Sequence, residues 1–239
     1  MAGSAGWHVL RALAVTVGLA LAAGGVSAVS GEATTAPLRD VALQIERKGV
    51  GDPSFFERAE RRSGTVLDAP GCSRDLVRSA ATLRVARLET AAVQAQDATE
   101  AIAAADRTLR AALACRPIDG NLWLRLAVVA VARDGFTPAA EDLLRRSIRL
   151  APAEDWIMAA RVRFLGALVE SGILEAEALF ASEAETYMRR ARVYEIVALY
   201  AAAGPAARAA QEAMWAALGE DRMSRIQRQA EIDGVYRTP

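Results

Sequence analysis

Two prolines in the middle of the chain, Pro117 and Pro152, mark an internal repeat with a period of 35 residues. Small and large residues precede both prolines at matching positions: Ala105, Leu109 and Ala112 before the first, and Ala140, Leu144 and Ser147 before the second. In such a pattern a small residue lets two helices approach, a bulky residue fills the gap, and the proline ends the helix. The repeat therefore predicts a short α-solenoid of antiparallel helical hairpins.

The composition favours the same fold class. Hydrophobic residues make up 53% of the 239 residues, yet aromatic residues are only 5%, and alanine, leucine and arginine are abundant. These three residue types lose little conformational entropy in a helix, whereas runs of β-branched and aromatic residues, which favour strands, are scarce. We therefore predict an all-α protein.

Capping residues divide the sequence into helices. The signals are Asp97 with Glu100, Thr137 with Pro138, Asp155, and the pair Gly204 and Pro205. The predicted helices cover 73–94, 97–115, 121–133, 137–150, 155–170, 173–185, 186–203, 205–219 and 221–232. The predicted organisation is an N-terminal hydrophobic segment at 1–31, a linker with short helices at 32–71, a hairpin domain at 72–218, and a C-terminal helix and tail at 219–239.

The repeat resembles the tetratricopeptide repeat (TPR). Trp123 and Leu126 follow Pro117 where the first helix of a TPR carries its Trp and Leu, although Ala127 replaces the usual glycine and Arg161 occupies an apolar position. The resemblance covers 100–155 and weakens over 156–218. The stretches Asn121 to Leu124, Gly135 to Pro138 and Pro152 to Trp156 are similar to short, N-terminally anchored TPR-like proteins of bacterial cell-envelope polysaccharide systems. The resemblance implies a binding scaffold with a concave face.

An uncharged stretch at 12–31 is close to the length that a helix needs to cross a bilayer. Arg11 precedes it and Glu32 follows it, which places the N-terminus in the cytoplasm and the bulk of the chain in the periplasm. The alternative is a signal peptide cleaved near Ala28, which leaves a soluble periplasmic protein. Both interpretations export the chain from Glu32 onward.

The two cysteines flank the first predicted hairpin. Cys72 precedes its first helix and Cys115 ends its second, so the antiparallel arrangement places both at the same end. In an oxidising compartment this geometry predicts a disulfide between Cys72 and Cys115. The alternative is two buried thiols.

Few side chains suit catalysis. His8 is the only histidine and lies outside the exported part, so histidine-dependent nucleophilic catalysis and histidine-based zinc sites are excluded there. A glycoside-hydrolase type of chemistry would need paired carboxylates, and one acidic cluster exists: Glu170, Glu175, Glu177, Glu183 and Glu185. We expect these residues to form a solvated face, and we expect no enzymatic activity, cofactor or metal.

Recognition is the function that the sequence favours. Trp123, Trp156 and Trp215 are candidates for lining a binding groove, with Trp156 and Trp215 as the candidates outside the repeat motif. The interspersed charges, 29 basic and 29 acidic, argue against nucleic acid as a partner. The leading hypothesis is a non-enzymatic adaptor at the inner membrane that binds another envelope protein. A carboxylate-dependent enzyme acting on glycans and a purely structural spacer are the alternatives.

Overall fold

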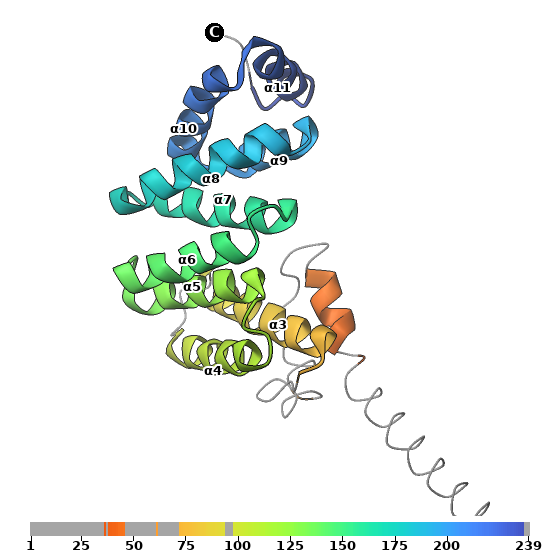
Figure 1. Cartoon of the computed structure of the whole chain (residues 1–239), viewed down its shortest axis with the longest axis vertical. Coiled ribbons are helices and arrows are strands. Elements are labelled where there is room, and N and C mark those ends of the chain that lie inside the picture. Colours follow the sequence, from red (N-terminus) through yellow and green to blue (C-terminus); the bar gives the residue numbers. More distant parts are fainter. Residues whose placement is uncertain (1–35, 37, 46–60, 62–71, 94–97, 237–239) are drawn as a thin grey trace, which may run out of the picture. The chain divides into compact units, whose positions relative to one another are not determined.

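The computed structural model describes residues 36, 38–45, 61, 72–93 and 98–236. These residues form helices, turns and bends, and none of them lies in a strand, so the predicted all-α class is confirmed for the described part of the chain (Figure 1). The chain divides into two compact units, of which the first ends at Ala111 and the second begins at Ala112.

The first unit contains a helix over 38–45, helix α3 (Arg74–Val93) and most of α4 (Thr99–Cys115). The helix over 38–45 buries Leu38 against Ala80 and Leu83 of α3, because small residues on one face of α3 let the two helices approach closely. The predicted cap residue Asp97 lies outside the described residues.

The second unit is a succession of short helices. Their bounds are α5 (Gly120–Asp134), α6 (Pro138–Leu150), α7 (Asp155–Glu170), the 3-10 turn η1 (Leu174–Ala176), α8 (Glu177–Arg190), α9 (Val193–Ala202), α10 (Pro205–Trp215), the 3-10 turn η2 (Ala216–Leu218) and α11 (Glu220–Ile232). Helices α5 and α6 pack against each other along their lengths, as do α7 and α8 (Figure 1). This helical-repeat-like arrangement is compatible with a TPR-like fold.

The hairpin of α5 and α6 follows from local signals. The Asp119 carboxylate accepts hydrogen bonds from the backbone N–H groups of Asn121 and Leu122 and caps α5. The Thr137 hydroxyl accepts from the N–H of Ala140 and caps α6, as predicted. Gly120 lets the start of α5 approach the residue that follows α6, Ala151. A Cβ at position 120 would lie only 2.5 Å from the Cβ of Ala151.

Helices α9 and α10 follow each other in the chain but do not pack together as a hairpin. Gly204 and Pro205 end one helix and begin the next, as predicted, but α10 packs mainly against α7 and α8, and α9 packs mainly against α11. The C-terminal helix α11 contributes Ile226 and Ala230 to the same core as α7 and α8. The close pairing of the earlier hairpins thus ends at α8.

Three arginines cap the C-terminal ends of helices that precede them in the chain. Arg161 of α7 donates to the Ala151 carbonyl, just after α6. Arg208 of α10 donates to the carbonyls of Tyr200 and Ala201 in α9. Arg222 of α11 donates to the carbonyls of Met188 and Ala191 at the end of α8. The last carbonyls of a helix lack intrahelical donors and carry partial negative charge, so a forked guanidinium satisfies both needs.

One predicted helix limit and one predicted helix cap are wrong. Helix α8 runs through Thr186 to Arg190, because the Thr186 hydroxyl donates to the Ser182 carbonyl one turn back and is thereby accommodated within a helix. The break falls instead at Ala191 and Arg192, whose backbones are extended. Asp155 does not cap α7; it is the first helical residue, where its negative charge complements the helix dipole.

Candidate functional site

The disulfide predicted between Cys72 and Cys115 is present. It joins the residue two positions before α3 to the last residue of α4. This bond closes a covalent loop of about 40 residues, a length for which the chain-entropy model gives a stabilisation of about 4 kcal/mol.

The residues of the repeat motif lie mostly in the interior. Seven of them are buried, namely Ala105, Leu109, Ala112, Leu126, Ala140, Leu144 and Ser147. The two prolines are exposed, and each follows two positions after a helix end, at Cys115 and Leu150. Their placement matches the packing role that the spacing suggests.

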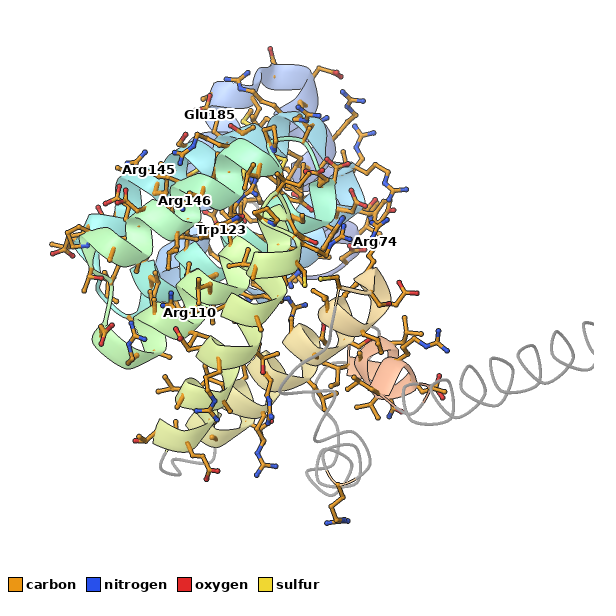
Figure 2. The ribbon with its side chains drawn as sticks, turned by 60° about the horizontal axis from the view of Figure 1, so that its bottom comes forward. Arg74, Arg110, Trp123, Arg145, Arg146 and Glu185 are labelled. Carbon is orange, nitrogen blue, oxygen red and sulfur yellow. The ribbon has the colours of Figure 1, made fainter. Side chains whose placement is uncertain are left out.

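Trp123 has a partly buried ring with a defined polar contact. Its indole N–H donates to the Pro117 carbonyl over 2.7 Å, and the Arg146 guanidinium lies 4.9 Å from the ring centre (Figure 2). Both contacts come from within the hairpin and the turn before it. Trp123 is therefore already engaged with its own repeat.

Trp156 and Tyr194 are the exposed aromatic residues of the second unit. Each is the second residue of its helix, α7 and α9 respectively, and the two are 51% and 52% exposed. The Arg192 guanidinium lies 4.8 Å from the centre of the Tyr194 ring and forms a 2.5 Å ion pair with Glu195. The predicted candidate Trp156 is thus accessible, whereas sequence reasoning missed Tyr194.

Charges at the starts of α7 and α9 act on one buried group, the Tyr187 phenol of α8. Burial raises the pKa of Tyr187 to about 12, the negative charges of Glu195 and Asp155 act in the same direction, and Arg163 opposes them. Glu195 and Asp155 belong to the first turns of α9 and α7, and the surface formed by these two turns therefore acts on the same hydroxyl. We call this surface, with Trp156 and Tyr194, the α7–α9 face.

Trp215 is not available for binding. Its side chain is 1% exposed, and its ring centre lies 4.9 Å from that of Tyr200 and 5.5 Å from that of Tyr236. The ring forms an aromatic cluster that holds the end of α10 to α9 and to the segment after α11. The proposal from sequence that Trp215 lines a groove is therefore wrong, because this large apolar surface stabilises the core instead.

A pocket of about 230 Å³ lies where α7, α9 and α10 meet. Its walls are mostly apolar and come from Val162 and Ala167 of α7, Leu199 and Ala202 of α9, and Ala203 at the corner. The polar or charged residues that line it are Arg163, Glu170 and Gln211. The pocket exists because α10 turns away from α9 at Gly204.

Glu170, at the rim of this pocket, connects α7 to the start of α10. One oxygen of its carboxylate accepts from the backbone N–H groups of Ala206 and Ala207, over 2.8 and 3.3 Å, and so caps α10 from another helix. A Cβ at Gly204 would collide with this carboxylate, so a larger residue there would displace the Glu170 side chain from the cap. Gln211 is 1% exposed, and its side-chain oxygen has no hydrogen-bond partner.

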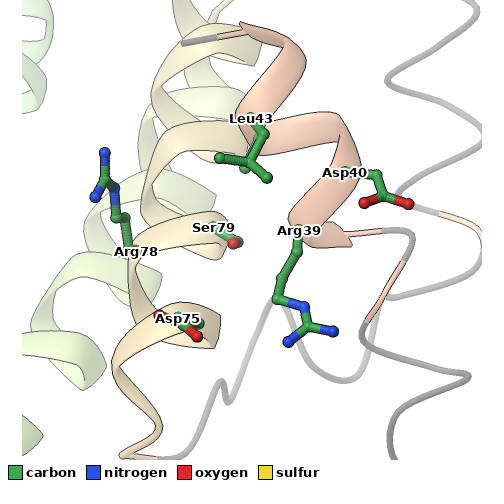
Figure 3. A pocket seen from close by; sticks show the side chains of 7 residues that line it. Arg39, Asp40, Leu43, Asp75, Arg78 and Ser79 are labelled. Carbon is green, nitrogen blue, oxygen red and sulfur yellow. The ribbon is translucent and has the colours of Figure 1, made fainter.

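The first unit contains a larger cleft, of about 380 Å³, between the helix over 38–45 and α3 (Figure 3). Arg39, Asp40, Asp75 and Arg78 line it together with the neutral Leu43, Ala42 and Ser79. The two positive and two negative charges balance, so the cleft has no net preference for an anion or a cation. It does not define a ligand class.

The acidic residues proposed for glycan chemistry have separate structural roles. Glu183 forms a buried 2.5 Å ion pair with Arg161, Glu185 pairs with Arg189 over 2.6 Å, and Glu170 caps α10. Glu175 and Glu177 are exposed at the turn between α7 and α8. Within the described residues, no group of three His, Cys, Asp or Glu side chains is placed to hold a metal ion.

No family model, curated protein or solved structure matches this chain. Among the described helices, none is long and apolar enough to cross a membrane, and the segment 12–31 lies outside the described residues. The α7–α9 face and its pocket are therefore characterised by their own chemistry.

Sequence reasoning could not find the pocket. Gln211 and Arg163 fall in ordinary positions of an amphipathic helix, and their relation depends on the angle between α9 and α10. Tyr194 had a detectable signal, since it occupies the same second position in its helix as Trp156. That signal was hidden because the start of α9 was placed too early.

Proposed function

We propose that this chain is a non-enzymatic protein-binding scaffold of the bacterial envelope, and that the α7–α9 face is its binding surface. Residues 12–31 hold it at the inner membrane, with the hairpins in the periplasm; cleavage near Ala28 would leave the same hairpins soluble in that compartment. The disulfide between Cys72 and Cys115 supports an oxidising location.

The observation that carries the proposal is the exposure of Trp156 and Tyr194 in the first turns of α7 and α9, with the Arg192 guanidinium against the Tyr194 ring. Tryptophan, tyrosine and arginine dominate the energetics of protein interfaces because they bury a large area and add a polar contact. The two aromatic side chains lie in the first turns of α7 and α9, which α8 separates in the sequence, and helical-repeat proteins commonly bind partners along a surface built from several helices. The partner that this surface suits is another envelope protein.

In-cell photocrosslinking tests the proposal. A photoreactive aromatic residue replaces Tyr194, and the covalent adducts formed in intact cells are identified with and without the second substitution Trp156→Ala. Truncation of a hot-spot side chain costs more than about 1 kcal/mol, so we expect the adduct yield to fall about fivefold or more at limiting partner. A photoreactive residue at Leu174, which is 71% exposed, is the matched control and should not give this adduct.

The same assay separates a scaffold from an enzyme. The double variant Glu175→Gln and Glu177→Gln should retain the adduct and the cellular phenotype if the chain is a scaffold. Loss of the phenotype with the adduct retained would instead favour carboxylate chemistry. Identical adducts from positions 194 and 174, or an adduct yield at position 194 that Trp156→Ala leaves unchanged, would contradict binding by the α7–α9 face.

A further inference from the structure

The size of the pocket between α7, α9 and α10 suits one side chain. Its volume of about 230 Å³ is well above what a single water molecule needs, and it is below the range of about 300–1,000 Å³ typical of small-molecule sites. The walls are alanine, valine and leucine, so the body of an occupant must be apolar. A pocket of this size and lining suits one anchoring side chain.

The tip of the occupant must be able to hydrogen-bond. Gln211 lines the pocket, is almost fully buried, and has a side-chain oxygen without a partner. An unsatisfied buried acceptor is costly, and the last torsion of a glutamine side chain has a broad, roughly two-fold profile, so a half-turn of the amide exchanges the positions of its oxygen and its nitrogen. A hydroxyl both donates and accepts, and it therefore satisfies either end of this amide.

The rim selects for an uncharged aromatic body. Arg163 and Glu170 lie at the pocket with opposite charges, so neither a cation nor an anion is favoured. Within residues 98–236, no carboxylate forms an ion pair with Arg163, which leaves its guanidinium available to stack on a ring. The residue type with an apolar aromatic body and a hydroxyl tip is tyrosine.

We infer that the pocket receives a tyrosine side chain of the partner protein, with Gln211 as the residue that recognises its hydroxyl and Arg163 stacked on its ring. The inference rests on the proposed function and assigns its specificity to Gln211. The pocket lies toward the C-terminal ends of α7 and α9, whereas Trp156 and Tyr194 lie in their first turns, so a partner segment that runs along the two helices from the α7–α9 face reaches it.

The test compares two soluble probes that differ by one hydroxyl, N-acetyl-tyrosinamide and N-acetyl-phenylalaninamide. Their binding to the full chain is measured by titration with NMR detection. One additional hydrogen bond in a buried site should make the tyrosine probe bind about fivefold more tightly. The substitution Gln211→Met should remove this preference by weakening the tyrosine probe alone, and the matched control Gln227→Met on α11 should retain it.

A second variant tests the pocket without altering Gln211. Ala202 is an exposed residue of the α9 wall, and Ala202→Leu should fill the pocket and abolish binding of both probes. Equal binding of the two probes to the unaltered chain, or a tyrosine preference that survives Gln211→Met, would overturn the inference. The adduct formed at position 194 reports separately on the scaffold: if it forms while the probes bind equally, only the tyrosine inference fails.

Discussion

Arg161 is among the largest fully buried side chains of the protein, although the repeat pattern places an apolar residue at its position. A buried cation is tolerated only when its charge and its donors are all matched. Here Glu183 supplies the opposite charge, and Ser147 and Ala151 supply acceptors. One side chain thus connects the end of α6 with α7 and α8.

Removal of Arg161 should therefore be severe. Arg161→Met leaves Glu183 buried without a counter-charge, and we expect a loss of about 3–5 kcal/mol in the free energy of unfolding, measured by denaturant titration. The matched control is Arg225→Met, which breaks an exposed ion pair with Asp221 and should cost below about 1 kcal/mol. The double variant Arg161→Met and Glu183→Leu should recover much of the loss. Equal effects of the two single variants would contradict this account.

Two buried phenols predict a decline of stability at high pH. Burial raises the pKa of Tyr187 to about 12, and burial with the hydrogen bond to Glu212 raises that of Tyr200 to about 12, from an ordinary value of 10.0. The unfolded chain releases these protons first, so the stabilising contribution is complete below pH 10 and is lost as the pH rises toward 12. Tyr187→Phe and Tyr200→Phe should each flatten the decline measured by denaturant titration, and an undiminished decline in both variants would contradict this account.

At the scale of the helices, local signals were reliable where the capping group is adjacent in sequence. Thr137 with Pro138 and Gly204 with Pro205 fixed the starts of α6 and α10. The prediction failed at Thr186, because a threonine can cap a helix or bond back within one, and the choice depends on what the helix buries. It also could not see that Glu170 caps α10 across a large sequence separation.

The capping of α10 by Glu170 can be measured by a double-mutant cycle. Gly204→Ala displaces the flexible Glu170 side chain, so we expect the free energy of unfolding to fall by about 1 kcal/mol, the usual value of a helix cap. Glu170→Ala should cost a similar amount, and the two together little more than either alone. Additive costs would show that Gly204 and Glu170 act independently.

Gly120→Ala offers a contrast. The new Cβ would meet Ala151, which cannot move aside, so overpacking should lower the free energy of unfolding by about 1–3 kcal/mol.

At the scale of the whole molecule, the repeat period predicted hairpins, but not where their regular pairing ends. Helices α5 and α6 pair as the pattern predicts, and so do α7 and α8. In contrast, α10 packs against α7 and α8, and α9 packs against α11. The aromatic cluster of Tyr200, Trp215 and Tyr236 stabilises this departure through contacts between three distant segments. The pocket with Gln211 is a consequence of that tertiary arrangement, and so no local pattern contained it.

The disulfide should make stability depend on redox conditions. Reduction of the bond between Cys72 and Cys115 should lower the free energy of unfolding by up to about 4 kcal/mol, measured by denaturant titration with and without reductant. The variant Cys72→Ser with Cys115→Ser should start at the lower stability and should not respond to reductant. A response in that variant would mean that the reductant acts elsewhere.

The same covalent loop has a consequence for proteolysis. A protease that cuts the backbone between Cys72 and Cys115 produces two polypeptides that remain joined through sulfur. The hairpins from α5 onward would then stay attached to the N-terminal segment after one cut, and would be released only by a second cut outside the loop or by a reductant. A single cut in this region therefore leaves one band on a non-reducing gel and gives two fragments on a reducing gel.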